Sequence, residues 1–413
     1  MRPPLRNTTL VVLLTFLAAV LFAACGSSSS STNSAESGGV SSTESNAASA
    51  EGETSSGGGG DVAEFEEQLD QGLKSTNTDP PKTSPPVQSG KTITAVVYGL
   101  GSPTGVEVKK GLVAAAAAIG WKLNVVDGKF NTNVQLTGLR EGIANHSDGI
   151  ILWAVDCPSV KAGVEEAKAA KIPIIYTEAF DCNEVEEGSG PSTGYGIGKY
   201  NLLSSSEQGE FPEYMQAFGA LQAAAGIVHN EGKMNAIVLN ETDINSAINI
   251  TKGFVDATER CSECQIEKEL KFGGTQFGAP LEEMVAQALL QSPETNTVFG
   301  NYDDPVIEGA APAVRNAGKQ ESVYVTGAAG YKPMTELIRE DAGANMTIGL
   351  SLLWEGWASM DRLNRLFAGE TTEPETGIGM EVIDAENNLP AAGQAWVPKI
   401  NFEAAYEAAW KAG

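Results

Sequence analysis

The sequence has 413 residues, enough for two domains of ordinary size after a long polar N-terminal region. Its formal net charge is −26, which excludes the basic surface that nucleic-acid binding requires and suits solubility outside the cell. An anionic ligand would need local hydrogen-bond donors, because the overall charge of the protein would repel it.

Residues 1–24 have the layout of a secretory signal, with Arg2 and Arg6 before an apolar run at 10–21. Crossing a bilayer takes about 20 apolar residues, so the run is too short to be a comfortable span. The segment 21–26 resembles the lipobox of bacterial lipoproteins, although Phe22 stands where the usual pattern has Leu. The resemblance implies a diacylglycerol on Cys25, and an ordinary secretory signal with a chance Cys is the alternative.

Residues 25–60 form the predicted tether, because Ser, Gly, Ala, Thr, Glu and Asn dominate them and such a stretch cannot bury enough apolar surface to fold. Residues 61–90 form a lead-in to the folded part. Phe65, Leu69 and Leu73 recur at the spacing of a helical face. This helix either docks on the main body or is a solvated spacer, and the Pro-rich crossing after it is expected to be extended.

From residue 91 short apolar runs alternate with helical patterns, which predicts βαβ units and parallel sheets. In the first half we expect strands at 92–98, 121–126, 149–153 and 172–176, and helices at 106–119, 134–145 and 160–170. Residues 183–205 interrupt the rhythm, and a helix is expected at 207–225. In the second half we expect strands at 236–239, 266–270, 297–299, 323–325 and 347–350, and helices at 244–258, 281–290, 305–317, 332–339 and 354–367.

Assigning Cys25 to lipid leaves four cysteines, an even number that can pair in an oxidising compartment. Cys157 and Cys182 each follow an apolar strand-like run, and Cys261 and Cys264 form a C-x-x-C. We expect disulfides Cys157–Cys182 and Cys261–Cys264. Zinc ligation and a redox dithiol are the alternatives, although neither His lies near in sequence for zinc.

The sequence lacks the patterns expected of an enzyme. His146 and His229 are its only histidines, and neither has the spacing of a metal site or a catalytic triad. It contains no G-x-S-x-G and no P-loop. We therefore expect a binding protein with no catalytic residues, no metal and no cofactor.

Several segments between 92 and 389 together resemble the type I periplasmic binding proteins of the ribose-binding branch. They are AVVYGLGSP at 95–103, DGIILWAVD at 148–156, KIPII at 171–175, TKGF at 251–254, VFGNYD at 298–303, YVTG at 324–327 and FAGE at 367–370. The resemblance implies two Rossmann-like α/β lobes with parallel sheets, joined by three crossover segments. It places lobe one at 91–200 with 352–382, lobe two at 201–351 with 383–400, and a C-terminal helix at 401–413.

The resemblance also implies a ligand site between the lobes. Its predicted contacts are Ser102, Trp153, Glu178, Asn245, Asn249, Phe277, Tyr302 and Asp303.

Several family positions depart from the pattern of sugar-binding members. Thr104 and Gly105 stand where two stacking aromatics are expected, Ala179 and Ile250 replace Arg, Ala329 replaces Asp, and Leu350 replaces Gln. A buried hydroxyl without a partner costs about 1–3 kcal/mol. The lining should therefore disfavour ribose, and we expect a sugar or sugar-like ligand, with a less polar or aromatic compound as the alternative.

The predicted function is a lipid-anchored extracytoplasmic protein that delivers a small molecule to a membrane permease driven by an ATPase. The alternative is a ligand sensor that presents its closed form to a membrane receptor or kinase. We expect a monomer that contacts the membrane through its lipid only and binds no nucleic acid.

Overall fold

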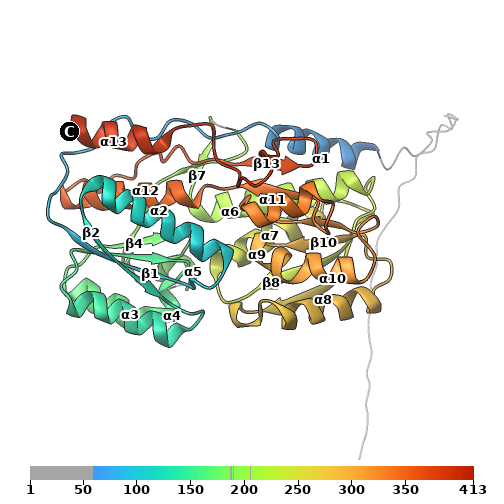
Figure 1. Ribbon diagram of the computed structural model, residues 1–413, viewed down its shortest axis with the longest axis horizontal. Coiled ribbons are helices and arrows are strands. Elements are labelled where there is room, and N and C mark those ends of the chain that lie inside the picture. Colours follow the sequence, from blue (N-terminus) through green and yellow to red (C-terminus); the bar gives the residue numbers. More distant parts are fainter. Residues whose placement is uncertain (1–58, 187, 189, 205) are drawn as a thin grey trace, which may run out of the picture. The chain divides into compact units, whose positions relative to one another are not determined.

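The computed structural model describes residues 59–413 except 187, 189 and 205. The predicted signal, Cys25 and the tether up to residue 58 lie outside the described residues. All described residues belong to one compact unit, in which two α/β lobes lie next to each other (Figure 1). None of the helices described is long and apolar enough to cross a membrane.

Lobe one is built on a five-stranded sheet whose strands are all parallel. In sheet order the strands are β2 (Lys122–Asp127), β1 (Thr92–Val97), β3 (Gly149–Trp153), β4 (Ile174–Thr177) and β5 (Tyr195–Gly196). Every residue of β3 and β4 is buried, as expected for parallel strands covered by helices on both faces. The helices of this lobe are α2 (Pro103–Ile119), α3 (Thr132–Ala144), α4 (Cys157–Ala169), α5 (Cys182–Val185), α12 (Leu352–Phe367) and α13 (Phe402–Ala412).

Lobe two contains a six-stranded sheet, parallel except for its last strand. In sheet order the strands are β13 (Glu381–Asp384), β12 (Met346–Gly349), β11 (Tyr324–Thr326), β10 (Thr297–Gly300), β8 (Asn235–Glu241) and β9 (Gln265–Phe272). Its helices are α1 (Gly59–Gly72), α6 (Phe211–His229), α7 (Asn245–Thr258), η1 (Gly274–Gln276), α8 (Ala279–Gln291), α9 (Asp303–Pro305), the π-helix η2 (Val306–Ala310), α10 (Ala311–Asn316) and α11 (Lys332–Arg339). Helices α6 and α7 pack closely where each has a glycine. A β-carbon at Gly219 would collide with the carbonyl of Ile250, and one at Gly253 would collide with the carbonyl of Gln216.

These two lobes confirm the predicted fold class. The chain passes between them near 197–210, 350–352 and 368–380. The first of these carries a small hairpin of β6 (Tyr200–Asn201) and β7 (Gln208–Gly209), so α6 begins at Phe211 rather than at the predicted position 207.

Two further connections between the lobes were not predicted. Residues 73–90, which we call the strap, lead from α1 on lobe two to β1 in lobe one, and residues 385–401 lead from β13 to α13. The strap is held along its length: the Thr76 backbone N–H donates to the Met380 carbonyl at 3.0 Å, and the Ser84 hydroxyl donates to Asp361 Oδ1 at 2.7 Å. Figure 1 shows α1, β13 and α13 along one edge of the unit.

Helix α1 docks on the body through its predicted apolar face. Phe65 is buried with 1% of its surface exposed, and Leu69 and Leu73 pack partly buried against the same core. The helix contacts α6 and β13. The docked alternative is therefore confirmed.

The helix expected at 305–317 contains a π-turn at 306–310. Pro312 has no N–H to donate to the carbonyl of Glu308, and in a regular helix its ring would clash with that carbonyl. The chain widens instead, and the Ala311 N–H bonds to the Val306 carbonyl five residues back.

Candidate functional site

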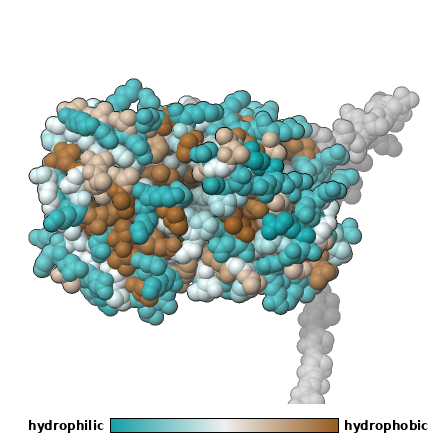
Figure 2. Space-filling model, viewed as in Figure 1, coloured by the Kyte–Doolittle hydropathy of each residue, from teal (hydrophilic) through white to brown (hydrophobic). Residues whose placement is uncertain are grey.

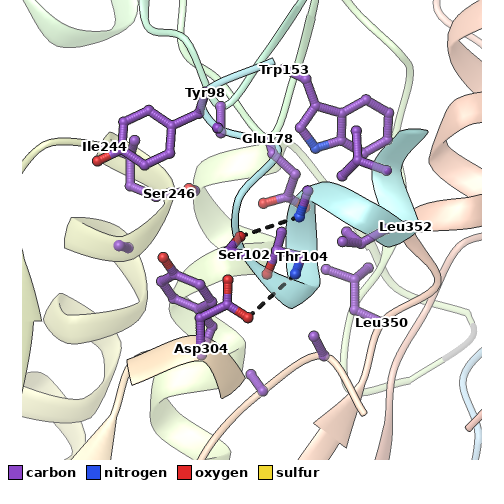
Figure 3. Close-up of a pocket in the computed structure, with 18 of the residues that line it drawn as sticks. Tyr98, Ser102, Thr104, Trp153, Glu178, Ile244, Ser246, Asp304, Leu350 and Leu352 are labelled. Atoms are coloured by element: carbon purple, nitrogen blue, oxygen red, sulfur yellow. Dashed lines mark hydrogen bonds between the residues drawn. The ribbon is translucent and has the colours of Figure 1, made fainter. Parts of the chain in front are cut away.

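The carboxyl ends of strands from both lobes meet around one cavity of about 70 Å³, which is room for more than one water molecule. Figure 3 shows Trp153 and Glu178 of lobe one and Ile244 and Asp304 of lobe two projecting into the same space. Ligands of open α/β sheets bind beyond the carboxyl ends of strands, and interfaces between domains are the usual place for small-molecule sites. This cavity is therefore the candidate binding site.

The backbone is strained where it borders the cavity. Ala154, Glu178 and Ala329 have φ values of 51°, 52° and 126°, in the region that favours glycine. All three line the cavity. Strained non-glycine residues persist where the surrounding structure holds them, and they cluster at functional sites.

Most of the cavity wall is apolar. Trp153, the last residue of β3, is 1% exposed and its indole Nε1 has no hydrogen-bond partner among the described residues. The remaining apolar wall is formed by Val97, Val108, Phe130, Met215, Phe218, Ile244, Ala247, Ile250, Leu350 and Leu352. A mostly apolar wall with a few polar groups is usual for small-molecule sites.

Glu178 directly follows β4 and forms a buried pair with Glu355 of α12. Burial raises the pKa of both carboxyls, and the charge of Glu178 raises the pKa of Glu355 further. Tyr200 donates its hydroxyl to Glu355 Oε1 at 3.3 Å. Two carboxyl groups in contact cannot both ionise readily, so the pair retains a proton at a pH where isolated carboxyls would both be ionised.

Asp304 enters the cavity from lobe two. Its Oδ1 accepts the backbone N–H of Thr104 of lobe one at 3.3 Å, whereas its Oδ2 is buried without a partner among the described residues. Burial raises the pKa of Asp304 to about 7.

Glu241 ends β8 and links the lobes at the rim of the cavity. Tyr98 of lobe one donates its hydroxyl to Glu241 Oε1 at 3.0 Å, and Tyr302 of lobe two donates to Oε2 at 2.6 Å. Burial raises the pKa of Glu241 to about 8. Together with the contact between Thr104 and Asp304, these bonds join the two lobes around the cavity.

Four of the eight predicted contacts line the cavity, namely Ser102, Trp153, Glu178 and Tyr302. Ser102 also caps α2, since its hydroxyl accepts the Gly105 N–H.

The other four predicted residues lie outside the lining. Asn245 donates its backbone N–H and its side chain to Asp156 Oδ2 of lobe one at 2.8 and 2.9 Å. Asn249 bonds to the Asn245 carbonyl. Phe277 packs edge-on behind Phe130.

Asp303 is buried inside lobe two, where it forms hydrogen bonds with two neighbouring segments. Its carboxylate accepts the Thr347 hydroxyl at 2.7 Å and the Tyr331 N–H at 2.9 Å. Its neighbour Asp304 lines the cavity in its place. The family segment at 298–303 pointed to Asp303 and did not include Asp304.

Both predicted disulfides are present in the structure, Cys157–Cys182 and Cys261–Cys264. The first joins the start of α4 to α5, next to the loop that carries Glu178. The four cysteines are therefore paired as two disulfides, which leaves no free thiolate among them to bind zinc in this structure.

Two facing α/β lobes around an enclosed cavity define a binding protein of the two-lobed, solute-enclosing class. The chain belongs to the periplasmic binding protein domain family, whose model matches residues 93–371. Members of this family bind solutes and are not enzymes.

Alignments with known proteins extend over most of the chain. The ribose import binding protein of Bacillus subtilis is 24% identical over 274 residues, 65% of this chain and 80% of the relative. A sugar ABC transporter subunit from Rhodobacter sphaeroides superposes with a TM-score of 0.60 at 18% identity, over 72% of this chain and 99% of that one. A Mycobacterium smegmatis protein in complex with β-D-fucofuranose gives a TM-score of 0.58 at 21% identity, over 72% and 92%.

Proposed function

We propose that this protein is an extracytoplasmic solute-binding protein that encloses a small, sugar-like ligand of low polarity and delivers it to an ABC permease. The observation that carries the proposal is the cavity between the lobes, with Trp153, Glu178 and Tyr302 in its wall. Hinge closure of two lobes around a ligand is an established mode of such folds. The import of ribose by the Bacillus subtilis relative and the fucofuranose bound by the Mycobacterium smegmatis protein support the same role.

The apolar wall supports a ligand with fewer hydroxyls than ribose. Ile250, Ala329 and Leu350 line the cavity at positions where the resemblance led us to expect hydrogen-bonding side chains. Each unpaired buried hydroxyl would cost about 1–3 kcal/mol, so deoxy sugars, short polyols or ring compounds of similar size should bind better than ribose.

We further propose that the protein is held at the membrane by lipid on Cys25. The segment at 21–26 resembles a lipobox and is followed by a long polar stretch. A binding protein anchored in this way stays beside its permease.

A thermal-shift screen of the full chain tests the ligand proposal, with pentoses, hexoses, deoxy sugars, polyols, nucleosides and aromatic acids as probes. A ligand at 100 times its Kd should stabilise the protein by about 2.7 kcal/mol. Trp153→Ala should weaken the best ligand about tenfold or more through lost ring contact, whereas Leu290→Ala, at an 82% exposed site on α8, should leave it unchanged. A screen in which no small molecule raises the melting temperature would contradict the proposed function.

A further inference from the structure

The cavity contains acids from both lobes and no base. Glu178 of lobe one and Asp304 of lobe two both line it, and no Lys, Arg or His occurs in its described lining. Figure 3 shows the two carboxyl groups entering from opposite sides, with Ser102 and Thr104 between them.

Nothing in the described part of the chain neutralises these acids. None of its ion pairs involves Glu178, Asp304, Glu241 or Glu355. The buried partner of Glu178 is a second acid, Glu355, which disfavours the ionisation of both groups and neutralises neither. Asp304 keeps one buried oxygen, Oδ2, without a hydrogen-bond partner.

A buried charge without a partner is costly, which restricts the chemistry of the ligand. A carboxylate or phosphate on the ligand would find no cationic partner in the described lining and would disfavour the ionisation of Glu178 and Asp304 further. A ligand rich in hydroxyls would leave several of them against Val108, Ile250 and Leu352 of the apolar wall. A molecule with an apolar body and one cationic group avoids both costs.

We propose that the ligand carries one protonated amine on a small, largely apolar body, and that the amine binds between Glu178 and Asp304. This inference rests on the proposed function and specifies its ligand class. Because the two acids belong to different lobes, one cation that bonds to both would hold the lobes together around it. The rings of Trp153 and Tyr302 in the same wall add favourable faces for a cation.

Matched pairs of amines and alcohols test the charge directly, because the two members have nearly the same shape. Isobutylamine and isobutanol, cyclohexylamine and cyclohexanol, and galactosamine and galactose would be titrated into the full chain by calorimetry at neutral pH. At least one amine should bind about tenfold or more tighter than its alcohol, since hydrogen bonds to charged groups are worth about 1.5–3 kcal/mol.

Charge-removing variants locate the amine. Glu178→Gln and Asp304→Asn should each weaken the amine about tenfold and so remove most of its preference over the alcohol, whereas Glu283→Gln, which removes an exposed charge on α8, should leave that preference unchanged. Glu178→Asp keeps the charge and should retain the preference for the amine, which separates loss of charge from loss of fold.

Each other outcome counts against the inference. Equal binding of amine and alcohol, or tighter binding of the alcohol, would overturn it while leaving the proposed function intact. If neither the amines nor any compound of the wider screen binds, both the inference and the proposed function fail.

Discussion

Glu241 is a single titratable side chain that is hydrogen-bonded to both lobes, so its protonation is expected to affect the stability of the protein. It is buried, it accepts hydroxyls from Tyr98 of lobe one and Tyr302 of lobe two, and its pKa is raised from 4.5 to about 8. The acids Asp243 and Asp304 lie near it and raise the pKa further. Its protonated form is therefore favoured in the folded, closed protein.

The protein should lose stability as the pH rises from about 5 to 8. The native state holds a proton on Glu241 that the unfolded chain releases near 4.5, so its contribution is largest at the acidic end of this window and is lost by about pH 8. Asp303 and Asp304, both with a pKa raised by burial to about 7, act in the same direction. Melting temperatures measured across this window should fall.

Glu241→Gln provides the variant for this prediction, because an amide keeps the size of the side chain and removes its titration. The fall in melting temperature should be smaller in Glu241→Gln than in the parent. Glu283→Gln, at an exposed site, should retain the full fall. An identical pH dependence in Glu241→Gln and the parent would show that Glu241 does not contribute.

Sequence reasoning found the cavity residues that lie at strand ends, such as Trp153 and Glu178, because parallel strands present their carboxyl ends at one edge of the sheet. It selected Asp303 where the structure has Asp304, since the directions of two adjacent side chains depend on the backbone conformation of the turn after β10. It also missed Glu355, which reaches Glu178 from a helix far along the chain. Partners of this kind are set by tertiary packing and leave no local pattern.

Strands and helices with a regular pattern of apolar residues were predictable from the sequence. Segments without regular secondary structure, which are held by individual hydrogen bonds, were not. The apolar run of β3 predicted its limits of Gly149–Trp153, and α11 was predicted at Lys332–Arg339. The strap left no such pattern, because polar side chains such as Ser84 and backbone groups hold it. Helix α1 was predictable in part. The spacing of its apolar residues predicted which face of the helix is buried, but not that this face packs on α6.

The docking of α1 should contribute measurably to stability. Phe65→Ala removes a buried ring from the contact between α1 and the body, and such substitutions cost about 3–5 kcal/mol. Urea unfolding of the full chain would measure the loss. Glu66→Ala, exposed on the same helix, is the matched control and should cost less than about 0.5 kcal/mol. A loss of under about 1 kcal/mol for Phe65→Ala would indicate that α1 adds little to the fold.

At the scale of the whole molecule, the described surface is polar with one apolar area on the face that Figure 2 shows. Figure 2 shows a mostly hydrophilic face, with apolar surface gathered over lobe one, where α2 exposes Val106 and Val113.

Cys25→Ser should release the protein from the membrane. In a bacterial host the parent should fractionate with membranes through its lipid, whereas the variant, which lacks the thiol that accepts the lipid, should be found in the soluble extracytoplasmic fraction or the medium. Ser27→Ala, two residues away in the sequence, is the control and should remain with the membrane. A Cys25→Ser protein that stays membrane-bound would contradict lipid attachment at this residue.

The strap has a consequence for the kinetics of ligand exchange. Residues 73–90 lead from α1 on lobe two to β1 in lobe one, and the connection after β13 makes a similar passage. The two lobes are therefore joined by five covalent connections instead of three, and an opening motion would involve all of them. Resistance to opening acts on the closed complex before the ligand leaves, so it lengthens the residence time of a bound molecule. The strap is thus expected to control how long a captured molecule is retained.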